Sequence, residues 1–375
     1  MRENSNLKSV RFCFLLALSF LLGGCGGGTK PFPAIPPTSG SEFVLATSNS
    51  QVLAYAVNLT TGALSQPMVA AGPGTAAGIL ASPSAKFVYA ADGFASAVDV
   101  FSLNSTTGAP AVSGSPVSLG ATPFAIAMDP AGKFLFVPEE LTAGVGAFTV
   151  NSSTGALTAV TGSPFATGNG PARATVDPSG KFLYVSDSLD ANGGISAYTI
   201  NSTSGALTSI AGSPFATLPV GSPTSVAVNP NGKFLYACEF AVNEVVVVPI
   251  NANGSLGGVV GFPSLAGNHP VGIAVNSAGT FLYVANSLDA TISVFSINAS
   301  TGALTAITGS PFAAGAAVSS LAIDPSGKYL YVTNPVANTI TGFNINATSG
   351  APTQFVSLPV AAGTQPTSLT VVAIP

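Results

Sequence analysis

A Phe-Leu-Tyr tripeptide, or a close variant of it, returns about every 50 residues along this 375-residue chain. Most copies follow a Pro-x-Gly-Lys turn and precede a valine-rich run. A fixed period of this length, with strand-forming residues in every copy, indicates a propeller or a solenoid. The copies and their preceding residue are 86–89 (KFVY), 133–136 (KFLF), 181–184 (KFLY), 233–236 (KFLY), 280–283 (TFLY) and 328–331 (KYLY).

Each repeat holds four short strands. In the copy that begins at Pro270, we expect strands over residues 270–276, 280–286, 291–298 and 303–309, because each is rich in Val, Ile, Phe or Thr and is bounded by turn residues. Asp or Asn stands in the first turn and Asn in the third turn of most copies, where the side chain can bond its own backbone. An open β-solenoid is the alternative, but hairpin units of this length do not match solenoid rungs.

The two ends of the chain supply the parts of one more repeat. Six complete repeats begin near residues 76, 123, 171, 223, 270 and 317. Residues 43–70 supply three strands, and residues 366–374 (PTSLTVVAI) supply the missing first strand. We therefore predict an all-β, seven-bladed β-propeller of four-stranded antiparallel blades over residues 42–375. The C-terminal strand completes the N-terminal blade, which closes the ring and hides its edges.

The first 41 residues indicate export. Three basic residues precede an apolar run over residues 12–22, which is too short to span a bilayer, so residues 1–24 are expected to be a signal peptide. The sequence Leu22-Gly23-Gly24-Cys25 resembles the bacterial lipobox, so Cys25 is the expected lipidation site and residues 25–41 a flexible Gly/Pro-rich tether. An ordinary secretory signal that contains a cysteine is the alternative. We expect a lipid-anchored protein of the bacterial cell envelope, on the periplasmic or outer-membrane side.

Composition excludes several classes of function. Only 6% of the residues are charged and the net charge is −4, so the basic stripe of a nucleic-acid-binding protein is absent. No His or Cys pair stands at zinc-binding spacing, and we expect neither a metal nor another cofactor. Cys238 lies in an expected strand and is predicted to be a buried, inert thiol. We expect a monomer.

Several motifs resemble those of a known family. Tyr331-Val332-Thr333-Asn334 is the signature of YVTN-type propeller repeats, and residues 283–286 (YVAN) and 184–187 (YVSD) are close copies. The span 42–375 resembles the seven-bladed lactonase-like propellers, the group that includes bacterial 6-phosphogluconolactonase. This resemblance implies the propeller fold and a lactonase-type activity.

The family's catalytic motifs are only partly present. Active members carry Gly-Pro-Arg-His at the start of one inner strand and Asn-Glu-Leu after the second strand of the same blade. Glu139-Glu140-Leu141 matches the second motif, so the resemblance carries Glu140 over. The inner strand of that blade begins with residues 122–125 (TPFA), so the Arg-His pair is missing. The next blade begins Gly170-Pro171-Ala172-Arg173, with the arginine displaced by one position.

Polar loop residues gather at one end of the predicted ring. In a propeller, the loops that follow the second strands and the connections that enter the inner strands meet at the end of the central channel where ligands usually bind. The connections place Arg173 and His269 there, and the repeat lysines belong to the opposite face. The loops place the following carboxylates on the ligand-binding face: Asp92, Glu139, Glu140, Asp187, Asp190, Glu239 and Asp289.

Two functions fit this set of residues. The first is a binding or scaffold module that recognises a glycan, peptide or protein at its channel mouth. The second is a lactonase-like hydrolase, with Glu140 or Glu139 as the base and with Arg173 and His269 holding the carbonyl or an acidic group. Its substrate would be a non-phosphorylated lactone, because one arginine offers little charge for a phosphate. Structural roles, a carboxylate pair for Arg173 and a loop-backbone bond for His269, are the alternatives. We favour the binding module, since a fold alone does not determine function.

Overall fold

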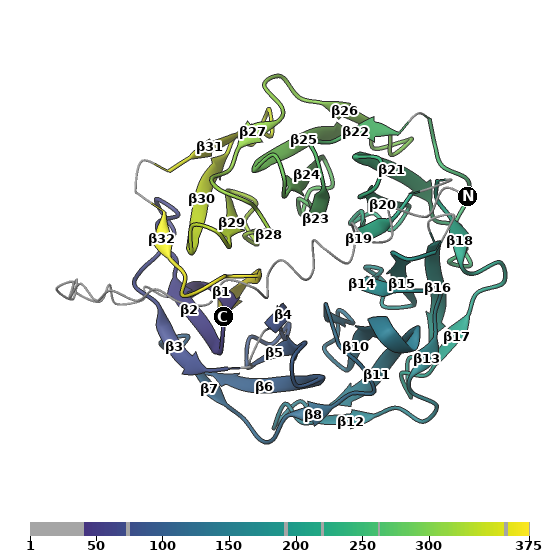
Figure 1. Ribbon diagram of the computed structural model, residues 1–375, viewed down its shortest axis with the longest axis horizontal. Coiled ribbons are helices and arrows are strands. Elements are labelled where there is room, and N and C mark those ends of the chain that lie inside the picture. The colour runs from purple at the N-terminus through teal and green to yellow at the C-terminus, as the bar shows by residue number, and fades with distance from the viewer. Residues whose placement is uncertain are drawn as a thin grey trace, which may run out of the picture. The chain divides into compact units, whose positions relative to one another are not determined.

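The computed structural model describes residues 41–72, 76–190, 194–218, 221–261, 263–355 and 359–374. The predicted signal peptide, Cys25 and nearly all of the predicted tether lie outside the described residues. Residues 37–375 form one compact unit. Within it, seven antiparallel sheets are arranged in a ring (Figure 1), and all the strand pairings that close the ring lie inside this unit. We therefore expect this part of the chain to fold by itself. Among the described residues, no helix is long and apolar enough to cross a membrane.

The blades are numbered along the chain, and their strands are given from the ring axis outward. Blade 1 consists of β33 (Ser368–Ile374), β1 (Ser41–Ser48), β2 (Gln51–Ala56) and β3 (Met68–Ala71). Blade 2 consists of β4 (Ala76–Ala81), β5 (Phe87–Asp92), β6 (Ala97–Leu103) and β7 (Pro110–Val112). Blade 3 consists of β9 (Ala127–Met128), β10 (Phe134–Glu139), β11 (Gly144–Val150) and β12 (Leu157–Ala159), with the short helix η2 (Glu140–Thr142) after β10. Blade 4 consists of β14 (Pro171–Val176), β15 (Phe182–Asp187), β16 (Gly194–Ile200) and β17 (Leu207–Ser209).

The remaining blades repeat this order. Blade 5 consists of β19 (Pro223–Val228), β20 (Phe234–Glu239), β21 (Glu244–Pro249) and β22 (Ser264–Leu265). Blade 6 consists of β23 (Pro270–Val275), β24 (Phe281–Asn286), β25 (Thr291–Ile297) and β26 (Leu304–Ala306). Blade 7 consists of β28 (Ser320–Ile323), β29 (Tyr329–Asn334), β30 (Thr339–Ile345) and β31 (Pro352–Gln354). In the described part of the chain, five blades carry an additional two-residue strand paired with the third strand: β8 (Val117–Ser118), β13 (Phe165–Ala166), β18 (Phe215–Ala216), β27 (Phe312–Ala313) and β32 (Val360–Ala361).

The prediction of seven four-stranded blades closed by the C-terminal strand is confirmed. β33 pairs with β1 from Ser41↔Ile374 to Thr47↔Ser368, so the two ends of the chain share one sheet. The short additional strands were not predicted, because two residues leave too weak a pattern in the sequence.

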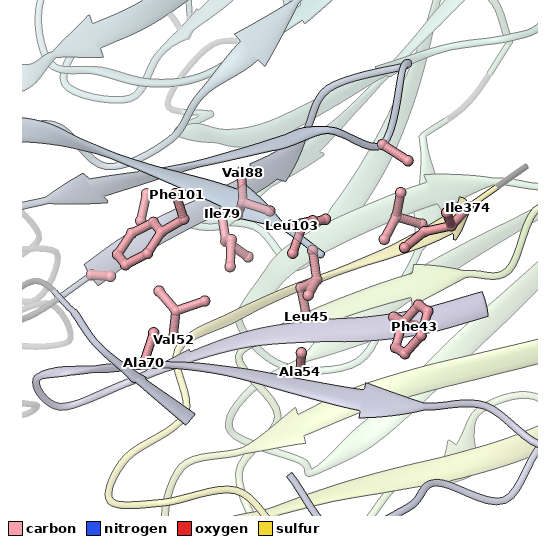
Figure 2. Packing of buried hydrophobic residues seen from close by; sticks show 14 residues of the cluster. Phe43, Leu45, Val52, Ala54, Ala70, Ile79, Val88, Phe101, Leu103 and Ile374 are labelled. Carbon is pink, nitrogen blue, oxygen red and sulfur yellow. The ribbon is translucent and has the colours of Figure 1, made fainter. Parts of the chain in front are cut away.

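The hydrophobic core lies between the blades. The described buried residues form seven clusters, one at each seam between consecutive blades. Figure 2 shows the seam of blades 1 and 2, where Val52 of β2 lies across from Ile79 and Phe101 of blade 2. Ile374 of β33 joins the same cluster, so the last strand contributes to packing as well as to pairing.

The repeated tripeptide joins each blade to the next one. Phe281 of β24 packs on Gly350, in the turn between the third and outer strands of blade 7. Gly350 has a φ of +74°, and a Cβ there would lie 2.4 Å from the Phe281 ring, so only glycine fits. The Tyr283 hydroxyl donates to the Gly350 carbonyl at 2.8 Å. Four other seams have the same bond, from Tyr89 to Gly155, Tyr184 to Gly254, Tyr236 to Gly302 and Tyr331 to Gly62.

Candidate functional site

Two kinds of loop meet at one end of every blade. The loops that follow the second strands hydrogen-bond to the loops that enter the inner strands, as in Phe240 N–H to the Ser222 carbonyl at 3.0 Å and Ser287 N–H to the His269 carbonyl at 2.9 Å. We call this end the loop face. The opposite end, the turn face, holds the turns between inner and second strands and between third and outer strands. The predicted site residues lie toward the loop face.

Four of the predicted carboxylates occupy one equivalent position, the last residue of the second strand. All four are buried, and Glu139, Asp187 and Glu239 pack beneath the loop that enters their own blade. At Gly221, for example, a Cβ would lie 2.4 Å from Oε2 of Glu239. This position is therefore a structural part of the repeat. Its seven occupants are Ser48, Asp92, Glu139, Asp187, Glu239, Asn286 and Asn334.

Two of these buried carboxylates are poorly satisfied. Asp187 accepts a hydrogen bond from the Ser196 hydroxyl at 2.7 Å on Oδ2, while its Oδ1 has no hydrogen-bond partner among the described residues. Neither carboxylate oxygen of Glu239 accepts a well-formed hydrogen bond in the described structure, although the Thr217 hydroxyl and the Ser222 N–H lie close enough to lower its pKa slightly against the effect of burial. Burial raises the pKa of Asp187 and that of Glu239 to about 7. Both groups are thus poised to hold a proton near neutral pH.

A third carboxylate with a raised pKa, Asp99, was not predicted from the sequence. Asp99 lies on β6 opposite Ala90, two residues before Asp92 on β5. Burial, and then the charge of Asp92, raise the pKa of Asp99 to about 6. An alignment of the third strands would have revealed Asp99 as an exception. The equivalent residues in three other blades are uncharged hydroxyl residues, Ser196, Ser293 and Thr341.

The remaining predicted carboxylates help to fasten the loops. Glu140 opens η2, is half-buried, and its N–H donates to the Thr122 carbonyl at 3.2 Å. Asp190 accepts the Asn169 N–H at 3.0 Å. The exposed Asp289 accepts the Asn268 N–H and side-chain amide at 2.7 and 2.8 Å, and these bonds lower the pKa of its carboxyl.

His269 lies at the seam of blades 5 and 6. Its φ is +56°, an uncommon value for a residue other than glycine, and its ring stacks on Phe240 with centroids 4.3 Å apart. The His269 N–H donates to Oδ1 of Asn243 at 2.9 Å, and its carbonyl accepts the Ser287 hydroxyl at 3.0 Å. The backbone of His269 is thus fixed by its neighbours.

Arg173 lies on β14, the inner strand of blade 4. Its N–H donates to the Ser186 hydroxyl at 3.1 Å, but no described residue accepts a hydrogen bond from its guanidinium. Burial lowers the pKa of Arg173, and the Cys238 thiol of blade 5 acts weakly against this shift. The equivalent residues of the other blades are all small: Gly78, Ala125, Ser225, Gly272, Ser320 and Ser368.

Comparison with known proteins places the fold in a family. The family model described as Lactonase, 7-bladed beta-propeller, matches residues 42–171, 161–271 and 262–368. The chain belongs to this lactonase family. A proposed 6-phosphogluconolactonase from Bacteroides fragilis NCTC 9343 is 22% identical, with a TM-score of 0.78 over 90% of this chain and 99% of that one. The periplasmic gluconolactonase of Pseudomonas aeruginosa is 18% identical, with a TM-score of 0.76 over 90% and 99%. At these identities the likeness shows the fold. No curated protein matches the chain.

This lactonase-family propeller distributes its three candidate catalytic residues over separate blades. Glu140 belongs to blade 3, Arg173 to blade 4 and His269 to the loop that enters blade 6. Cys238 is buried in β20, as predicted. Within the described ranges, no group of three or more His, Cys, Asp or Glu residues could hold a metal ion. Arg173 is therefore the predicted site residue that most clearly departs from the repeat.

Proposed function

We propose that this lactonase-family propeller binds a small molecule bearing a carboxylate or a lactone carbonyl, and that Arg173 is the binding group. The proposal depends on one observation: six blades have Gly, Ala or Ser where blade 4 has an arginine without an acceptor among the described residues. A guanidinium has five N–H donors, and partial burial without an acceptor is costly. A ligand oxygen would remove that cost.

The arrangement of charge narrows the ligand class. A planar guanidinium suits a carboxylate, which it can hold through two parallel hydrogen bonds. All five described lysines lie at the turn-face end of the second strands, so they add no charge near Arg173. One cation supports a monoanion or a neutral carbonyl better than a phosphorylated sugar. A sugar acid or its lactone meets these requirements.

Lactone hydrolysis is the second candidate, and family membership favours it. In such a step, Glu140 of the neighbouring blade would take a proton from water while the water oxygen attacks the carbonyl carbon. Arg173 would hold the developing oxyanion. The ring C–O bond then breaks, and the leaving oxygen takes up the proton to give a hydroxy acid.

Removing the guanidinium is expected to abolish most of the binding. In the chain from residue 37, Arg173→Gln should weaken binding of gluconate about 10- to 100-fold, because charge-assisted hydrogen bonds contribute roughly 1.5–3 kcal/mol. Lys181→Gln is the matched control, since it removes a cation from the same blade at the turn face. Titration calorimetry with gluconate measures the binding, and proton release from glucono-1,5-lactone measures hydrolysis.

The outcomes separate the two candidates. Binding that needs Arg173, without lactone opening, supports the binding module. Lactone opening that is lost in both Arg173→Gln and Glu140→Gln supports the hydrolase. Equal affinity for gluconate in the wild type and in Arg173→Gln would show that Arg173 does not bind the ligand.

We also propose that the protein acts in the cell envelope, anchored by lipid on Cys25. Support comes from the lipobox-like sequence at residues 22–25. Growth of a bacterial host with labelled palmitate should label the full chain and leave Cys25→Ser unlabelled. Label that survives in Cys25→Ser contradicts the anchor.

A further inference from the structure

The two faces of the ring carry opposite kinds of surface group. Each described lysine is exposed and immediately precedes the second strand, at the turn face: Lys86, Lys133, Lys181, Lys233 and Lys328. No described lysine lies on the loop face. There the exposed or half-exposed charged groups include Glu140, Asp190 and Asp289.

The loop face also carries exposed apolar tips. Phe94, Leu141, Leu288 and Val336 each stand two residues after the end of a second strand, in blades 2, 3, 6 and 7. Their side chains are 80%, 75%, 67% and 73% exposed. These four large apolar groups form two pairs on neighbouring blades, 2 with 3 and 6 with 7, and a partner surface could cover each pair.

Two hollows lie on the turn face, at neighbouring seams. One, of about 200 Å³, lies at the seam of blades 3 and 4 and is lined by Pro130, Ala131, Lys133 and Phe134 among others. A second, of about 220 Å³, lies at the seam of blades 2 and 3, with Pro83, Lys86 and Phe87 in its lining. The lining of each hollow combines apolar residues, serines and a lysine.

Charge follows the same repeat. The exposed lysines stand at the turn face of blades 2–5 and 7, and the exposed or half-buried carboxylates at the loop face of blades 3–6 are Glu140, Asp190, Glu244 and Asp289. Two copies stacked along the ring axis would therefore place lysines of one over acidic loops of the other. Such complementarity favours and orients association.

In place of the monomer expected from the sequence, we propose that copies of this propeller associate head to tail, with the apolar tips of one loop face seated in the lysine-rimmed hollows of the next turn face. The contact joins two different surfaces of the same chain, so it is heterologous and extends into a stack. This proposal does not depend on the identity of the ligand.

Two complementary variants test the geometry. The double variant Phe94→Ser/Leu141→Ser damages only the loop face, and Lys86→Glu/Lys133→Glu damages only the turn face. In analytical ultracentrifugation of the chain from residue 37, the wild type should grow in mass with concentration and return to monomer at about 0.5 M salt, where screening leaves few contacts between exposed charges. Each variant alone should stay a monomer.

Mixing the variants gives the decisive result. The loop-face variant keeps an intact turn face, and the turn-face variant keeps an intact loop face. One copy of each can therefore join through these two faces, so the mixture should form dimers and nothing larger. A wild type that stays monomeric at every concentration overturns the proposal. Association that persists in both variants, or a mixture that stays monomeric, also overturns it. So does a turn-face variant that still associates by itself, since a contact between two loop faces would behave in that way. Circular dichroism confirms that each variant is folded.

Discussion

Deletion of residues 366–375 should unfold the ring under conditions in which the intact chain is stable. This deletion removes β33, which pairs with β1 along its whole length. It also removes Leu369, Val372 and Ile374 from the core, at roughly 1.5–3 kcal/mol each. With the lost backbone hydrogen bonds at about 1 kcal/mol each, the loss approaches the whole stability of a typical domain, about 5–15 kcal/mol.

Side-chain bonds at the closure add to this effect. Thr367 bonds with Thr47 of blade 1 and donates to the Ala76 carbonyl of blade 2. Ser319 of blade 7 donates to the carbonyls of Pro366 and Thr367 at 3.2 and 3.1 Å. The segment before β33 therefore ties three blades together.

Urea unfolding followed by circular dichroism measures the loss. Ala373→Ser, an exposed change within β33, is the control and should alter the unfolding free energy by less than about 0.5 kcal/mol. A synthetic peptide of residues 366–375 should restore part of the structure. A truncated chain that unfolds at the urea concentration of the intact chain contradicts the closure.

The stability of the ring should fall as pH rises from about 4 to about 7. Burial raises the pKa of Asp187 to about 7 in the folded chain, whereas an unfolded Asp titrates near 3.9. Between these values the folded state keeps a proton that the unfolded state has lost, so higher pH favours unfolding. At about 1.4 kcal/mol for each pKa unit, the group costs up to roughly 4 kcal/mol above pH 7.

Asp187→Asn should remove this cost. The equivalent residue of blade 6 is Asn286, whose side-chain amide donates to the Ser293 hydroxyl at 2.9 Å, so blade 4 can accept an amide beside Ser196. The variant should match the wild type near pH 4 and exceed its unfolding free energy at pH 8. Asp289→Asn is the control with opposite sign, because the pKa of Asp289 is lowered in the folded chain. A wild-type stability that rises between pH 5 and pH 8, unchanged in Asp187→Asn, contradicts this account.

The sequence predicts the fold well because the same pattern of strands and turns occurs in six complete repeats. The spacing of the tripeptide gives the number of blades, and the incomplete repeats at both ends give the closure. It also predicts which loops share a face, since that follows from strand order alone. The sequence pattern does not predict which side chains fit together between blades, such as Phe281 against Gly350. These contacts are visible only in the packed structure.

The candidate site is less predictable. Asp187 and Glu239 look like loop residues in the sequence, yet the structure buries both at the end of a strand. Their equal offset of three residues from Tyr184 and Tyr236 is the signal that assigns them to the repeat. Arg173 stands out by the same alignment, because every equivalent residue is small. That no described residue accepts a hydrogen bond from its guanidinium, however, depends on three-dimensional neighbours and cannot be read from the sequence.

The tyrosine bonds between blades have a consequence for how the ring opens. In a closed ring every blade is held from two sides, so one cannot detach until two seams fail, whereas the end repeats of an open array fray singly. The hydroxyl bond is missing at two seams, where Leu45 and Phe136 replace tyrosine. These seams divide the ring into two arcs, blades 2–3 and blades 4–7 with blade 1. We therefore expect blades 2 and 3 to unfold together, as one small cooperative unit, before the rest of the ring.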